Sequence, residues 1–274
     1  MESAPEECIL CGSSTRELLI EKDSWKVCRC TNCGLGFLDP RPSEDEIKIL
    51  YGKEYFSRSY DKGFDPDSVE FKKRLSQETH RIRFFRGFKK RGSILDIGCG
   101  NGYFLAACRA EGYDVQGLDI SDWASEFAVE RLGIPVITGE IDSVGIPSNS
   151  YDIISMWHFL EHTRNPRMTI SKVLSWLKSD GILIIDVPNY ESTDARLNRE
   201  EWVGWQLPYH LYHFTPESLE MLLDIFELRI EKRKTYHSEA IKNRLREICV
   251  PKPLARLLAR MYSGTSLAVV SKRK

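Results

Sequence analysis

Four cysteines near the start of the chain are spaced as metal ligands. Cys8 and Cys11 form one Cys-x-x-Cys pair, Cys30 and Cys33 form a second, and 18 residues separate the two pairs. A glycine follows each pair and permits the tight turn that brings two thiolates onto one ion. Four thiolates complete the tetrahedral coordination of zinc, so the pattern predicts a structural zinc ribbon. Cys28 stands too close to Cys30 for such a pair, and we expect it to lie outside the metal site.

A carboxylate followed by three glycines at alternate positions forms the second candidate site. The stretch Leu95-Asp-Ile-Gly-Cys-Gly-Asn-Gly102 continues an apolar run, and a helical pattern begins at Tyr103. This order predicts a buried strand, a tight turn that a ligand can approach closely, and a helix. Asp96 would repel a phosphate but attract an amine, which favours an adenosine that carries an amino acid over a dinucleotide. Asp119 ends the next predicted strand, where a ribose needs hydrogen-bond acceptors.

These motifs resemble those of the class I S-adenosylmethionine-dependent methyltransferases. The resemblance implies S-adenosylmethionine as the cofactor, and it implies that an acidic and an apolar residue after the third strand contact the adenine. The cofactor-binding residues implied in this way are Asp96, Gly98, Cys99, Gly100, Gly102, Asp119, Ile120, Glu140, Ile141 and Trp157. The zinc-ribbon start, the connector Asp39-Pro-Arg-Pro42 and the segment His213-Phe-Thr-Pro216 also look like bacterial methyltransferases of small metabolites, often saccharides.

Histidines supply the candidates for proton transfer. Methyl transfer from a sulfonium needs the nucleophile and the methyl group to be aligned and one proton to be removed. The segment Tyr209-His-Leu-Tyr-His213 follows the fifth predicted strand within an aromatic cluster that could exclude water. We predict His210 as the base, with Tyr209 beside it and His162 as the second candidate, because imidazole titrates near neutral pH. The competing interpretation is that His210 and His213 only bond to the backbone.

Strands and helices alternate from residue 93 onward, which requires a parallel sheet with helices on both faces. The predicted fold class is therefore α/β, with a doubly wound, Rossmann-like, mostly parallel sheet of seven strands and a small N-terminal zinc ribbon. We predict a basic helix over 71–91, a helix from Pro166 closed by Gly181, and strands at 93–97, 114–120, 135–140, 151–157, 182–187, 228–234 and 266–270. The predicted domains are a ribbon with connector (1–42), a helical and aromatic cap (43–92) and a cofactor-binding domain (93–274) with insertions at 189–214 and 235–264.

The composition predicts a globular protein of the cytoplasm. The chain has 274 residues, 42% of them hydrophobic and 29% charged, which is enough for one large domain and a small appendage. The net charge of −1 provides no overall field for nucleic acid or an anionic membrane, so we expect neither as a partner. No apolar run approaches the roughly 20 residues of a membrane-spanning helix, and the acidic start is unlike a signal peptide.

The favoured function is methyl transfer to a small-molecule acceptor, with oxygen as the nucleophile. One alternative is RNA methylation, because some ribosomal RNA methyltransferases pair a four-cysteine module with this fold; the basic run over 72–91 favours it and the net charge opposes it. Another is a non-catalytic binding module, which the intact Asp96, Gly98, Gly100 and Asp119 oppose. The acceptor, the oligomeric state and the role of the basic amphipathic insertion at 235–264 stay open; that insertion could pack on the domain, form a dimer or cover the substrate.

Overall fold

The chain folds into two compact units, described here from a computed structural model of residues 1–50 and 67–274. The aromatic part of the predicted cap segment, at 51–66, lies outside the described residues. Unit 1 comprises Met1–Glu46, Leu160–Arg167 and Asp186–Val269, and unit 2 comprises Ile47–Phe159, Met168–Ile185 and Val270–Lys274. This division differs from the predicted domain boundaries, because the N-terminal ribbon groups with residues from the C-terminal half of the chain.

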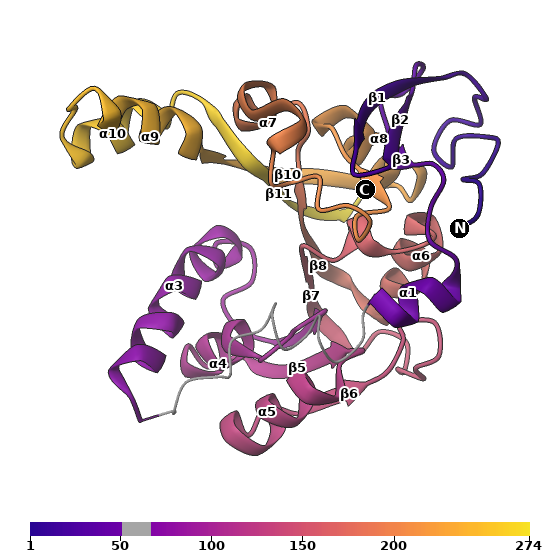
Figure 1. Ribbon diagram of the computed structural model, residues 1–274. Helices are drawn as coiled ribbons and strands as arrows, with labels where there is room; N and C mark the ends of the chain where they lie inside the picture. Colours follow the sequence, from indigo (N-terminus) through magenta and orange to yellow (C-terminus); the bar gives the residue numbers. More distant parts are fainter. Residues whose placement is uncertain (51–66) are drawn as a thin grey trace. The chain divides into compact units, whose positions relative to one another are not determined.

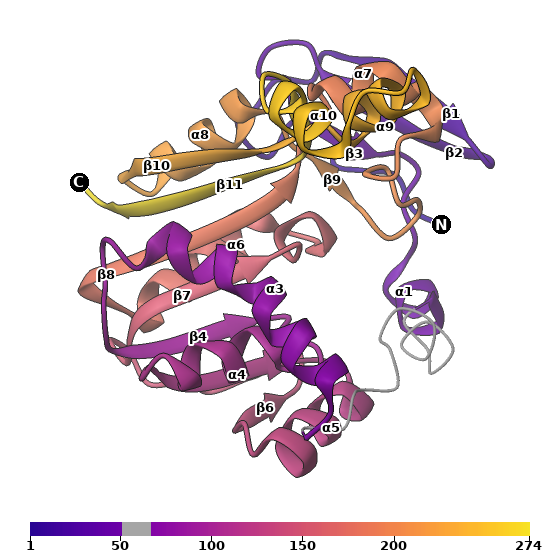
Figure 2. The same ribbon diagram turned by 90° about the vertical axis from the view of Figure 1, so that its left-hand side faces the viewer.

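Seven strands form the larger sheet, in the order β10-β11-β8-β7-β4-β5-β6 (Figures 1 and 2). Strand β4 pairs in parallel with both β5 and β7, and β5 pairs in parallel with β6. The strands are β4 (Ser93–Ile97), β5 (Asp114–Asp119), β6 (Val136–Thr138), β7 (Tyr151–Trp157), β8 (Leu177–Pro188), β10 (Leu228–His237) and β11 (Ser263–Arg273). The predicted α/β fold with a mostly parallel seven-stranded sheet is thereby confirmed.

Unit 2 is built on the parallel strands around β4. Ile94, Leu95 and Ile97 are fully buried, as expected for a strand with helices over both faces. The helices are α3 (Val69–Phe85), α4 (Tyr103–Ala110), α5 (Asp122–Leu132) and α6 (Pro166–Trp176). Helices α3 and α4 lie side by side (Figure 2), with the rings of Phe85 and Phe104 meeting edge to face at 6.3 Å. Ser121 caps α5 and Gly133 ends it in a left-handed conformation, the helix-end positions at which serine and glycine are preferred.

Two predicted helix ends are wrong. Helix α6 ends at Trp176 and β8 begins at the next residue, so Gly181 lies inside a strand and does not close the helix. A Cβ at Gly181 would lie 2.7 Å from Leu177 Cδ1, so the glycine serves close packing within β8. The basic helix ends at Phe85 and not at Arg91, because the chain turns there and the Phe88 amide donates to the Phe85 carbonyl.

Unit 1 contains the ribbon, and a distant segment completes its sheet. Strands β1 (Arg16–Lys22), β2 (Trp25–Cys30) and β3 (Gly36–Leu38) are antiparallel, and β9 (Tyr212–His213) pairs with β3. Gly36 lies opposite His213, and a Cβ at Gly36 would come within 2.9 Å of the His213 Cβ. Only glycine therefore lets the two strands approach, a pairing that the sequence did not predict.

Helices join the strands of unit 1. They are α7 (Thr193–Asn198), α8 (Pro216–Ile225), α9 (Glu239–Glu247) and α10 (Lys252–Ala259), with 3₁₀ turns at Leu160–His162 and Arg199–Glu201. A further helix, α1 (Glu44–Leu50), follows the proline-rich connector. Thr215 caps α8 in a reciprocal capping box with Ser218. In the part of the chain that the structure describes, no helix combines the length and apolar character needed to cross a bilayer.

Candidate functional site

The N-terminal cysteines form two turns of the same geometry. In each pair the first cysteine carbonyl accepts from the amide of the glycine four residues later, at 2.9 Å, and both glycines have a φ near +70°. Cys8 Sγ lies 3.5 Å from Cys33 Sγ, and Cys11 Sγ lies 3.5 Å from Cys30 Sγ. The four sulfur atoms all lie within 4.8 Å of one another, so they can converge on one tetrahedral ion. Cys28 is on β2 and outside this group.

The glycine-rich turn after β4 has the predicted backbone, and one of its glycines also packs closely against a side chain of the protein. Gly98, Gly100 and Gly102 all have positive φ, between 52° and 73°. A Cβ at Gly98 would meet Phe159 Cδ2 at 2.8 Å. The bare backbone at Gly98 therefore makes room for the Phe159 side chain, and packing within the protein is one reason for glycine at this position.

Asp96 lies just before this turn and is nearly buried, at 3% exposure. Its Oδ1 accepts a hydrogen bond of 2.6 Å from Ser155 Oγ on the neighbouring strand β7. Burial raises the pKa of Asp96 to about 7, although the Ser155 hydroxyl favours the charged form. The sequence did not single out Ser155. Its partner role follows from the register in which residues 96 and 155 are direct neighbours.

Asp119 ties the turn to the end of β5. Its Oδ2 accepts from the Gly100 amide at 2.7 Å and its Oδ1 accepts from the Ser121 amide at 2.9 Å. Burial raises the pKa of Asp119, and these amides favour its charged form. Each carboxylate oxygen can accept a second hydrogen bond, so Asp119 can hold the turn and still receive ribose hydroxyls.

The other predicted cofactor residues separate into exposed and buried ones. Ile120 follows Asp119 and is 52% exposed, an apolar surface that a bound ring could cover, while Glu140 is exposed and Ile141 half-buried after β6. Cys99 and Trp157 point inward. A Cβ at Gly117 would lie 2.4 Å from Cys99 Sγ, and the Trp157 ring packs edge to face with Phe104 under the Arg81 guanidinium. Only the backbone of Cys99 is therefore available to a ligand.

Helix α3, the predicted basic helix, carries a cluster of paired charges. Glu78 is 3% exposed and forms ion pairs with Arg74 and Arg81, one turn to either side. Arg81 also lowers, and Glu78 raises, the pKa of Asp96. The spacing of Arg74, Glu78 and Arg81 could have predicted these ion pairs, because residues three and four apart lie on one face of a helix.

A second group of titratable side chains lies in unit 1. Glu161 is fully buried and His210 is 3% exposed, while His162 is half-buried. The rings of His162 and His210 meet edge to face at 4.6 Å, and His210 Nε2 lies 3.9 Å from Glu161 Oε1. One ligand atom from each of the three lies within 4.8 Å of the others, so the group could hold a proton or a cation.

Backbone hydrogen bonds fix the tautomers of both histidines. His162 Nδ1 lies 3.1 Å from the Tyr209 carbonyl, and His210 Nδ1 lies 2.9 Å from the Gly204 carbonyl. A carbonyl only accepts, so each neutral imidazole carries its proton on Nδ1 and its lone pair on Nε2. The Leu211 amide also donates to the Glu161 carbonyl, which joins the 160–162 turn to the 209–211 segment. The predicted candidates His162, Tyr209 and His210 are therefore neighbours.

His213 does not belong to the group formed by Glu161, His162 and His210. Its side chain is buried against the Trp205 ring at 5.1 Å, and burial lowers the pKa of His213 to about 3. It is therefore neutral at physiological pH, and it contributes to packing where β9 joins the ribbon.

A family model and the sequences of known proteins match parts of this chain. A family model described as a methyltransferase domain matches residues 70–232, so the four N-terminal cysteines lie outside the match. A ubiquinone biosynthesis O-methyltransferase of Actinobacillus pleuropneumoniae is 26% identical over 160 residues, 53% of this chain and 68% of that protein. The protein of the same name from Photobacterium profundum is 30% identical over 104 residues, 35% of this chain and 43% of that protein.

Solved structures share the fold. A SAM-dependent methyltransferase from Archaeoglobus fulgidus has a TM-score of 0.54 and 22% identity, and covers 74% of this chain and 94% of its own. The plantazolicin methyltransferase BpumL in complex with SAH has a TM-score of 0.55 and 23% identity, and covers 83% of this chain and 93% of its own.

Proposed function

Because the chain belongs to the methyltransferase-domain family and is an S-adenosylmethionine-dependent methyltransferase, we propose that it transfers the methyl group to a hydroxyl of a small molecule. The observation that supports methyl-donor binding is the pair of buried carboxylates, Asp96 and Asp119, near the ends of adjacent parallel strands. Carboxyl ends of parallel strands meet at one edge of a sheet, which is where ligands bind in open α/β folds.

The proposed donor site divides the cofactor between these carboxylates. Asp96 would attract the positively charged amine of the donor, and Asp119 would accept from its ribose hydroxyls. Ile120, Glu140 and Ile141 would contact the adenine, with the backbone of the glycine turn approaching the rest of the donor. Trp157 and the Cys99 side chain are left out, because both pack inward.

Removing the Asp119 carboxylate should weaken donor binding. We expect Asp119→Ala to lower the affinity about 10- to 150-fold, the equivalent of one charge-assisted hydrogen bond of about 1.5–3 kcal/mol. Calorimetric titration with S-adenosylmethionine measures the effect, and circular dichroism checks that the variant is folded. Asp122→Ala, one turn further on at an exposed position, is the matched control and should bind normally. Unchanged affinity in both Asp119→Ala and Asp96→Ala would contradict the donor site.

Donor affinity should also depend on pH through Asp96. Its pKa is raised to about 7, so the carboxyl is neutral below that pH and charged above it. The charged form attracts the donor amine, so the association constant should rise as the pH rises through about 7 and then level off. Below that pH, binding should release a proton, which calorimetry in buffers of different ionisation enthalpy detects. Asp96→Asn should remove this dependence, and a variant with the wild-type pH profile would rule Asp96 out as its source.

We place the proton acceptor in the Glu161–His162–His210 group. His210 Nε2 carries a lone pair in the neutral tautomer, and the nearby Glu161 carboxylate would stabilise the imidazolium formed when a hydroxyl proton is taken up. His162, which is less buried and has the same tautomer, is the second candidate. His158 is the first residue after β7, and Glu161 follows it three positions later. The chain therefore reaches the proposed group directly after this strand.

Small molecules are the favoured acceptors. The named relatives are O-methyltransferases of ubiquinone biosynthesis, which supports oxygen as the nucleophile. RNA is less favoured, because Arg74 and Arg81 of the basic helix are paired with Glu78. Turnover on hydroxylated metabolites that is insensitive to salt supports the proposal. Activity on ribosomal RNA that falls steeply with salt would replace it, and donor binding without turnover would favour a non-catalytic module.

Zinc is proposed as a structural ion bound by Cys8, Cys11, Cys30 and Cys33. The four thiolates fit tetrahedral coordination without an open position, so the ion would stabilise the ribbon and take no part in methyl transfer.

A further inference from the structure

Helices α9 and α10 form a hairpin that concentrates exposed apolar and basic side chains. They pack against each other beyond the ends of β10 and β11 (Figure 1). Fifteen large hydrophobic residues are exposed in the described parts of the chain, and six of them fall between residues 248 and 262. These are Ile248, Leu254, Leu257, Leu258, Met261 and Tyr262. Scattered exposed apolar residues need no explanation, but a cluster of this density marks an interaction surface.

The exposed residues form one stripe on α10 and its continuation. Leu254, Leu257, Leu258 and Met261 are spaced i, i+3, i+4 and i+7, and their exposed fractions are 47, 57, 36 and 78%. Ala255 and Ala259, which lie on another face, are completely buried. The helix therefore packs through small residues and presents its large apolar ones outward, the reverse of a helix that covers a core.

The base of the hairpin holds this orientation. Asp194 on α7 is 3% exposed and accepts from the Ser238 hydroxyl and from the amides of Glu239 and Ala240. The Ser238 amide in turn donates to the carbonyls of Ala259 and Tyr262, at 3.2 and 3.1 Å. The start of α9 and the end of α10 are thus fixed to one buried carboxylate. The outward stripe is consequently a feature of the folded unit and does not result from fraying.

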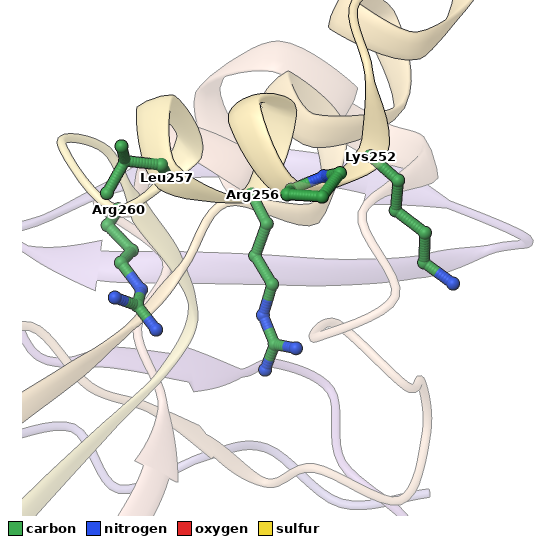
Figure 3. A pocket seen from close by; sticks show the side chains of 5 residues that line it. Lys252, Arg256, Leu257 and Arg260 are labelled. Atoms are coloured by element: carbon green, nitrogen blue, oxygen red, sulfur yellow. The ribbon is translucent and has the colours of Figure 1, made fainter.

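Cationic side chains flank the stripe. Residues 239–262 contain six lysines and arginines against two glutamates, a local charge of +4 in a chain whose net charge is −1. Lys252, Arg256 and Arg260 reach out on the same side of α10 (Figure 3), where with Pro253 and Leu257 they line a hollow of about 570 Å³. Two copies of this surface facing each other would bring like charges together, which argues against a second copy of the chain as the occupant.

We propose that the hairpin docks on an anionic lipid surface. A helix with an apolar stripe beside a row of Lys and Arg lies in the interface of a bilayer, with the stripe among the acyl chains and the cations at the headgroups. The hollow beside Arg256 and Arg260 would accept lipid phosphates. We expected no membrane partner from the net charge of the whole chain, but that value does not reveal the local excess of positive charge at residues 239–262. The proposal concerns association with a surface, and it is independent of the methyl acceptor.

Vesicle sedimentation of the full chain tests the proposal. The protein should sediment with vesicles that contain phosphatidylglycerol, remain in solution with pure phosphatidylcholine, and dissociate as the salt concentration rises. The double variant Arg256→Gln/Arg260→Gln should bind about 25-fold more weakly, from roughly fivefold per cationic side chain near an anionic surface. Leu257→Glu should lose about tenfold or more. The matched control Lys72→Gln/Lys73→Gln removes two exposed charges from α3 and should bind as the wild type does.

Three results would overturn the proposal. They are absence of sedimentation with anionic vesicles, equal loss in the α3 control, and binding that survives both hairpin variants. A hairpin-dependent affinity for RNA in place of vesicles would assign the surface to nucleic acid, and concentration-dependent dimerisation abolished by Leu257→Glu would assign it to a second copy. Normal S-adenosylmethionine binding by the variants shows that unit 2 remains folded, so failure here is distinguishable from failure of the methyltransferase proposal.

Discussion

Replacing His210 with alanine should lower turnover roughly 10²–10⁴-fold and leave donor affinity unchanged, because general-base catalysis contributes that much to proton removal. The substitution leaves every residue of the proposed donor site, including Asp96 and Asp119, unchanged. Single-turnover kinetics with a hydroxylated acceptor, together with calorimetric titration of the donor, separates the two quantities.

Two variants make this prediction specific to the proposed group. Glu161→Gln keeps the size of a fully buried side chain and should also slow turnover, because it removes the charge that would stabilise the imidazolium. His80→Ala, on the exposed side of α3, removes an imidazole outside the group and should be active. A His210→Ala enzyme that turns over at the wild-type rate would transfer the role of base to His162.

The sequence was most informative where local patterns determine the structure. The apolar run at 93–97 forms a strand whose residues 94–97 are buried, and the strand at 151–157 was predicted to the residue. Apolar runs bounded by turn residues have few alternatives in an α/β fold. The cap of α5 by Ser121 and its end at Gly133 are likewise local, since they depend on hydrogen bonds within five residues.

Pairings over long sequence separations were not predictable. The ribbon strand β3 pairs with Tyr212 and His213, which are more than 170 residues away in the chain. No periodicity in either segment predicts this pairing. The predicted boundary after residue 42 therefore separates the ribbon from the histidine segment, whereas the structure groups the two in one unit. The partner of Asp96 was missed for the same reason, because Ser155 reaches it only through the register of β4 and β7.

Packing requirements at glycines were not predictable. A Cβ at Gly98 would meet Phe159, a contact that the sequence does not reveal, and Gly181, predicted as a helix end, lies against Leu177 inside β8. A glycine in the sequence indicates a position at which a Cβ is not tolerated. Only the structure identifies the neighbouring group that excludes the Cβ.

Replacing Cys30 with serine should abolish zinc binding and unfold the ribbon. The variant leaves three thiolates in an incomplete site, and zinc supplies about 10–16 kcal/mol of binding free energy in small zinc modules, so β1–β3 should lose their order. Metal analysis should fall from one zinc per chain to none. Cys28→Ser is the matched control because Cys28 lies on the same strand, outside the cluster, and it should retain the ion.

The loss should extend to the histidine segment while leaving the donor site intact. Strand β3 pairs with β9, and the Leu38 amide donates to the Leu211 carbonyl at 3.0 Å, directly beside His210. We therefore expect Cys30→Ser to bind S-adenosylmethionine normally, to exchange amide hydrogens quickly at 209–213 and to turn over as slowly as His210→Ala. Zinc that survives Cys30→Ser but is lost in Cys28→Ser would show that the ligand assignment is wrong. Zinc loss with full activity would instead show that the ribbon does not support the proposed proton-transfer group.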